Sequence, residues 1–102
     1  MQAGIHNDES VLIAPERLIS ATRGEFRTMA LAHIDHLSAD AGVLVVDLGQ
    51  TTELDASGLG MLVLIQKRAK ERGLATRLRK TPERVRNLLK LTMLEFLFEL
   101  TD

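Results

Sequence analysis

The chain has 102 residues, a formal net charge of −1 from 13 basic and 14 acidic side chains, and no cysteine. This length suffices for one domain, residues 1–102, whose core needs no cross-links, and the lack of cysteine excludes disulfides, thiol catalysis and zinc–thiolate sites. The balanced charge and the scarcity of aromatic residues disfavour direct binding of nucleic acid. No apolar run approaches the roughly twenty residues that span a bilayer, and the first residues do not resemble a signal peptide, so we expect a cytoplasmic protein without membrane insertion.

The amino-terminal segment predicts a β-hairpin. Ile5 and His6 form a short edge strand, and a cluster of turn-forming residues, 7–10, follows it. Val11 to Ala14 then reads as a second strand, ended by Pro15.

A helix is expected after the hairpin. Thr22 and Glu25 have the spacing of a capping box, in which Thr22 accepts a hydrogen bond from the first turn and Glu25 reaches back. Apolar residues then recur at helical spacing and predict its buried face: Phe26, Met29, Ala30, Ile34 and Leu37.

The middle of the chain combines a strand, a polar connector and a second helix. Val43 to Leu48 is apolar, β-branched and too short for a helix, so it predicts a buried strand. Leu59 to Arg72 predicts a helix that stops at Gly73. The connector, residues 49–58, therefore presents first-turn amides and the positive end of a helix dipole, where a phosphoryl group or a carboxylate is favoured.

The second helix has two apolar groups when its residues are placed at about 100° per position. Val63 and Leu64 fall outside the stripe that should face the sheet, on the side shared by Gly60 and Lys67. Either a neighbouring helix covers them, or they form an apolar spot, flanked by Gly58 and Gly60, that a partner approaches closely. The stripe itself comprises Leu59, Leu62, Ile65 and Ala69, with Met61 at its margin.

The carboxyl-terminal part predicts strand, helix and strand. Residues 74–79 alternate weakly as a strand does, and Thr81 and Pro82 predict a helix start, with Thr81 as the cap. Residues 96–100 predict a closing strand. The order β-β-α-β-α-β-α-β indicates an α/β fold with a small, mostly parallel mixed sheet. The buried stripe of the last helix is expected to hold Val85, Leu88, Leu89 and Thr92.

The connector and the second helix resemble a known family. Residues 45–60, Val-Val-Asp-Leu-Gly-Gln-Thr-Thr-Glu-Leu-Asp-Ala-Ser-Gly-Leu-Gly, look like the signature of STAS domains, the family of anti-sigma-factor antagonists and related bacterial modules. Residues 9–12 fit its early strand, 81–92 its third helix and 94–98 its closing segment. The resemblance implies a STAS-like fold over most of the chain.

The resemblance also implies a function without catalysis. Such an antagonist docks the start of its second helix on an anti-sigma factor that is also a serine kinase, and phosphorylation beside the loop aspartate releases it. Other members bind the ATPase of an ABC-type lipid transporter. No catalytic constellation, cofactor motif or metal-ligand set is present, so we expect no enzyme, no cofactor and no metal. The expected partner-binding residues are Asp55, Ala56, Ser57, Gly58, Gly60, Val63, Leu64 and Lys67.

This sequence departs from the switch pattern at the acceptor position. The usual acceptor immediately follows the aspartate, where this chain has Ala56. Three alternatives remain: Ser57 is the acceptor, Thr51 or Thr52 is, or none is phosphorylated. Ser57 is also expected to cap the helix, and a carboxylate at Asp55 is favoured at the same helix end.

A second departure lies near Leu18-Ile19-Ser20, where family members often carry an acidic docking residue. In addition, ten of the thirteen basic residues lie between Lys67 and Lys90. They form either a solvated outer face or a surface for an acidic protein partner. A further alternative is a scaffold that forms a weak homodimer through its amino-terminal edge strand.

Overall fold

Four parallel strands form the main sheet in the part of the chain that the computed structural model describes, residues 10–101. The spatial order is β1-β3-β5-β6, and each pairing is parallel. The α/β architecture with a mostly parallel sheet is therefore confirmed. The strand expected at Ile5 and His6 lies outside the described residues. The strands of this sheet are β1 (Val11–Ile13), β3 (Val43–Asp47), β5 (Ala75–Arg79) and β6 (Glu99–Thr101).

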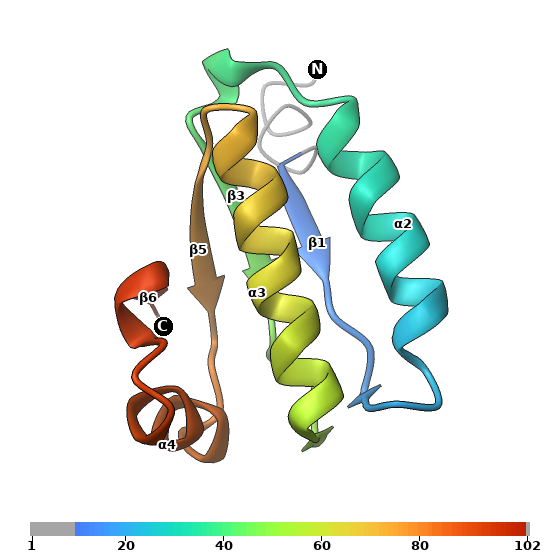
Figure 1. Cartoon of the computed structure of the whole chain (residues 1–102), viewed down its shortest axis with the longest axis vertical. Coiled ribbons are helices and arrows are strands. Elements are labelled where there is room, and N and C mark those ends of the chain that lie inside the picture. Colours follow the sequence, from blue (N-terminus) through green and yellow to red (C-terminus); the bar gives the residue numbers. More distant parts are fainter. Residues whose placement is uncertain (1–9, 102) are drawn as a thin grey trace.

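The helices differ in how they cover this sheet. Figure 1 shows two of them side by side in front of one face, while the third lies beyond the carboxyl ends of the strands. Both helices on the face begin at the same end of the molecule. The three are α2 (Arg23–Asp35), α3 (Ala56–Glu71) and α4 (Glu83–Leu91). No helix within residues 10–101 is long and apolar enough to cross a bilayer.

The helix α3 buries the stripe that its periodicity predicts. Every stripe residue is buried, including the marginal Met61, and they pack into one core with Leu44, Val46 and Leu78 of the sheet. Successive residues of a strand point to opposite faces, so Leu44 and Val46 share the helix-covered face. This core fixes the orientation of α3 and therefore which of its side chains face outward.

The other two stripe predictions are wrong in part. On α2, Met29 is 50% exposed, whereas Phe26, Ala30 and Ile34 are buried. On α4, Thr92 lies just beyond the helix end and is exposed, and its hydroxyl donates to the Leu88 carbonyl at 2.8 Å. Both errors fall at the edge of a stripe, where the burial depends on a neighbouring element.

Two predicted helix caps are also wrong. Thr22 precedes α2, but its hydroxyl donates to the Arg17 carbonyl at 2.6 Å and accepts from the Ile19 amide, which ties up the preceding turn. Before α4 the residue at the cap position is Pro82, and the Thr81 hydroxyl is buried without a partner among the described residues. For Thr22, the backbone groups of the preceding turn compete with the helix amides for its hydroxyl.

The closing strand begins later than predicted. Glu95–Leu97 form a 3-10 turn, so β6 starts at Glu99 instead of Phe96, which is 82% exposed. A second 3-10 turn, Ala39–Ala41, precedes β3.

A second, very small sheet holds the connector between β3 and α3. Its strands, β2 (Arg17–Leu18) and β4 (Glu53–Leu54), are parallel, and Arg17 forms an exposed ion pair with Glu53 at 3.0 Å. This strand pairing and ion pair therefore hold the segment before α3 against the segment before α2.

The start of the connector is fixed by Asp47 at the end of β3. Its carboxylate accepts from the Gly49 amide at 2.7 Å and pairs with Arg79 of β5 at 2.7 Å. Burial alone would raise the pKa of Asp47, but the Gly49 amide and the Arg79 guanidinium together outweigh it and hold the pKa below its ordinary value. The contacts of Asp47 thus fix the position at which the chain leaves the sheet.

Candidate functional site

Asp55 caps α3 and joins it to the loop before α2. One carboxylate oxygen accepts from the Gly58 amide at 2.9 Å and the other accepts from the Ser20 amide at 3.1 Å. These two bonds, Gly58 first, lower the pKa of Asp55 because they favour its ionised form. The cap role expected at this helix end therefore belongs to Asp55, and the prediction that Ser57 caps the helix is wrong, since Ser57 lies within the first turn.

Gly58 is a packing residue, which corrects its predicted place on the partner-binding surface. It is buried, and a β-carbon built on it would overlap the backbone carbonyl of Leu18 and crowd Leu54. Its lack of a side chain lets the start of α3 approach the β2 backbone. Gly58 therefore presents almost no surface to a partner.

Gly60 is the opposite case, two residues further along α3. It is exposed, and a β-carbon there would have no atom within 4 Å. A partner can therefore approach the α3 backbone at Gly60, as the sequence suggests for this part of the helix.

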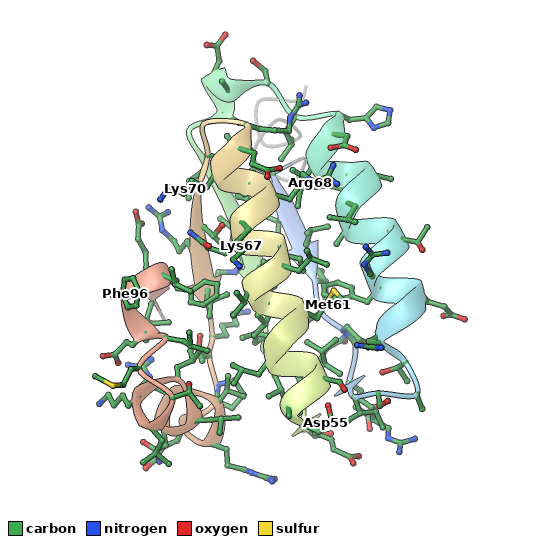
Figure 2. All side chains as sticks on the ribbon, in the orientation of Figure 1. Asp55, Met61, Lys67, Arg68, Lys70 and Phe96 are labelled. Carbon is green, nitrogen blue, oxygen red and sulfur yellow. The ribbon has the colours of Figure 1, made fainter. Side chains whose placement is uncertain are left out.

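An open groove lies between the first turns of α2 and α3, with a volume of about 520 Å³. Figure 2 shows Asp55 at the start of α3 and Met61 on the side of α3 that faces α2. Small residues, a half-buried serine and two apolar side chains form the α3 wall: Ala56, Ser57, Gly60, Met61 and Leu64. The α2 wall is formed by Arg23, Gly24 and Arg27.

The structure brings together only some of the eight residues predicted to bind a partner. Ala56, Ser57, Gly60 and Leu64 line the groove. Leu64 is half-buried and also packs against the core. Val63 is half-buried and Lys67 exposed, but neither of them lines the groove.

Sequence reasoning missed the α2 wall. Arg23 and Arg27 are four residues apart and therefore lie on one face of α2. That spacing is visible in the sequence, but which helix this face would meet depends on how α2 packs against α3. Within residues 10–101 no three His, Cys, Asp or Glu side chains are placed to hold a metal.

Comparison with known proteins assigns this arrangement to a family. The family model described as "Mlab, STAS domain" matches residues 1–99. The chain belongs to the STAS domain family. The recognised resemblance and the STAS-like fold are thereby confirmed.

Solved structures of three proteins share this STAS fold. One from Thermotoga maritima, proposed to be an anti-sigma factor antagonist, is 22% identical with a TM-score of 0.74, covering 91% of this chain and 80% of that one. An anti-sigma-factor antagonist (STAS) domain protein from Planctomyces limnophilus is 19% identical with a TM-score of 0.79, covering 90% and 80%. A sulfate transporter family protein from Wolinella succinogenes is 16% identical with a TM-score of 0.72, covering 90% and 75%.

The hydroxyl groups near the start of α3 in this STAS domain differ in accessibility. Thr51 is buried, and its hydroxyl donates to the Pro15 carbonyl at 2.8 Å. Thr52 is exposed beside the Glu16 carbonyl, outside the groove. Ser57 is the one candidate acceptor that lies in the groove.

Proposed function

We propose that this STAS domain is a non-enzymatic regulatory module that works by binding another protein, as an anti-sigma-factor antagonist in a partner-switching pathway. The docking surface comprises the exposed part of residues 55–64 and the groove beside it. The single observation that carries the proposal is that the first three turns of α3 are exposed at Ala56 and Gly60 and half-exposed at Ser57 and Leu64, while the opposite face is buried in the core. The two structural neighbours described as anti-sigma-factor antagonists support it.

Phosphorylation of Ser57 is the proposed control of this docking. Ser57 is half-buried and lines the groove, and its hydroxyl has no side-chain partner among residues 10–101, whereas the Thr51 hydroxyl donates to the Pro15 carbonyl. A phosphoryl group there would add nearly two negative charges next to Leu64 and Met61, which disfavours an apolar contact.

The test is a phosphorylation assay with a serine kinase of the anti-sigma-factor class. Wild type and Ser57→Ala are incubated with ATP and the kinase, and the phosphate is located by mass spectrometry. The proposal expects one phosphate on Ser57 and none on the variant. The opposite result is that the kinase forms a stable complex with this protein but adds no phosphate under conditions that fully modify a control antagonist. That result would contradict control by phosphorylation and show that the protein binds the kinase constitutively.

A second candidate is an accessory subunit that binds the ATPase of an ABC-type lipid transporter without being phosphorylated. Ala56 favours it, because this chain lacks a hydroxyl at the usual acceptor position. The neighbour from a sulfate transporter family is in line with a transporter-associated role. Copurification with a transporter ATPase, lost in Leu64→Ala, together with no phosphate on Ser57, would select this candidate.

A further inference from the structure

The groove between α2 and α3 carries a positive charge on one wall that nothing in the described structure neutralises. Arg23 and Arg27 are exposed, and neither forms an ion pair with any residue within 10–101. The groove has no acidic side chain in its lining. Glu25, which lies between the two arginines in sequence, lines a different groove next to Phe26 and Met29.

The nearest carboxylate in sequence on the α3 side is already engaged. Asp55 uses both of its oxygens for the amides of Gly58 and Ser20. Its negative charge is therefore held by the backbone at the helix start, and the two arginines of α2 remain available.

At the far end of the same helix pair, the arginines have partners within the protein. There Arg68 of α3 pairs with Asp35 of α2 at 3.0 Å, and Arg72 donates to the Leu37 carbonyl at 2.7 Å. Figure 2 shows Arg68 near the end of α3 opposite to Asp55. The two helices are thus joined by charge at one end and left open, with unpaired arginines, at the other.

The α3 wall, which faces the arginines, is apolar apart from Ser57 and has no side chain at Gly60. Gly60 offers open space above the α3 backbone, and half-buried Leu64 provides apolar surface beside it, while Met61, which also lines the groove, is buried. An occupant that matches both walls has a carboxylate for the guanidinium groups and, next to it, an apolar side chain for the α3 surface. Arginine binds carboxylates with paired hydrogen bonds, which makes such a contact directional.

We propose that this groove binds a protein segment in which an aspartate or glutamate stands next to a large apolar residue, with Arg23 and Arg27 binding the carboxylate. The inference rests on the proposed function and specifies the chemistry of its partner. It reverses the charge expected from the resemblance, in which an acidic residue of the antagonist contributes to docking. Here the STAS domain supplies the cations and the partner supplies the acid.

The test uses random peptides of twelve residues displayed on phage as the probe. They are selected on wild type, on the double variant Arg23→Glu/Arg27→Glu, and on the matched control Arg84→Glu/Lys90→Glu. The control changes two exposed basic residues of α4 that lie outside the groove, by the same total charge. Melting curves check that the three proteins are equally folded.

The proposal expects acidic–apolar peptides to be enriched on wild type and on the α4 control. Their affinity, measured by calorimetry, should fall at least about tenfold on the Arg23/Arg27 variant, and binding should weaken as sodium chloride is raised. Enriched peptides without carboxylates, equal binding to the Arg23/Arg27 variant, or no enrichment on folded wild type would each overturn the proposal.

Binding to an anti-sigma-factor serine kinase separates this inference from the function on which it rests. If the kinase binds wild type and the Arg23/Arg27 variant equally, the charge inference fails and the proposed function stands. If the kinase binds neither, while acidic–apolar peptides still bind wild type, the anti-sigma role fails and the chemistry of the groove stands.

Discussion

Gly58 of α3 lies directly against the backbone carbonyl of Leu18, so closely that a β-carbon at Gly58 would overlap the carbonyl oxygen. Leu18 belongs to the two-residue strand β2, and the Asp55 amide donates to this same carbonyl at 3.4 Å. The start of α3 is thus seated on the segment that leads into α2. This contact sets the relative position of the two groove walls, so the groove depends on a glycine that is itself buried.

Gly58→Ala should therefore destabilise the fold, by about 3 kcal/mol, because the added methyl group has to displace backbone. Gly60→Ala is the matched control on the same helix. Alanine there meets no atom and should stabilise the protein by roughly 0.5–1 kcal/mol, since glycine is a poor helix former. Urea unfolding of the two variants measures both effects. Equal stability of the two alanine variants would contradict the close contact at Gly58.

The stability contributed by Asp55 should depend on pH in a defined direction. Its pKa in the folded protein is below the ordinary value of 3.8, so the unfolded chain takes up a proton first as the pH falls. The stabilisation is complete above pH 3.8 and is lost as the pH falls through the lower, folded pKa. Asp55→Asn keeps a cap oxygen but cannot titrate. Wild type should thus be more stable than Asp55→Asn near neutral pH, and the difference should disappear in acid.

Denaturant unfolding of both proteins at a series of pH values tests this expectation. Asp47 also has a lowered pKa, but it is present in both proteins, and its contribution cancels in the comparison. A stability difference that stays constant down to the acid limit would show that the charge of Asp55 contributes nothing at the α3 start.

The periodicity of the sequence was sufficient for the architecture because each element carries its own signal. The run Val43 to Leu48 specifies a buried strand, and the spacing of Leu59, Leu62 and Ile65 specifies which side of α3 is inside. Alternation of such strands and helices leaves few topologies other than a parallel sheet with covering helices. The resemblance to the STAS signature independently predicted the same fold.

Several of the errors arise from contacts between distant segments, which no local pattern encodes. The pairing of β2 with β4 joins residues about 36 positions apart through two-residue strands that have no pattern of their own. For the same reason, nothing local distinguishes Gly58, which meets Leu18, from Gly60, which meets nothing. The groove wall at Arg23 and Arg27 is likewise set by the packing of α2 on α3.

Leu64→Ala should weaken partner binding much more than it weakens the fold. Leu64 is half-buried and lines the groove, so the loss in unfolding free energy should be about 1 kcal/mol, whereas loss of a central apolar contact lowers affinity more than about tenfold. Leu62→Ala, fully buried on the same helix, is the stability control and should cost about 3 kcal/mol. Thermal melting and calorimetry with the anti-sigma-factor kinase measure both quantities. A loss at Leu64 as large as that at Leu62 would make Leu64 a core residue and leave the docking surface without its apolar contact.

Ser57→Asp should weaken binding of the same kinase at least about tenfold relative to Ser57→Asn. The two variants have nearly the same shape, so their difference isolates the negative charge. An aspartate in the groove places a carboxylate beside the apolar surface of Leu64 and offers Arg23 and Arg27 an internal anion in place of the partner's acid. The α3 start should tolerate the change, because a negative charge is favourable in the first turn of a helix. Calorimetry on both variants, after melting curves have established equal folding, makes the measurement. Equal affinity of the two would show that charge at Ser57 does not control docking, and the protein would then bind its partner constitutively.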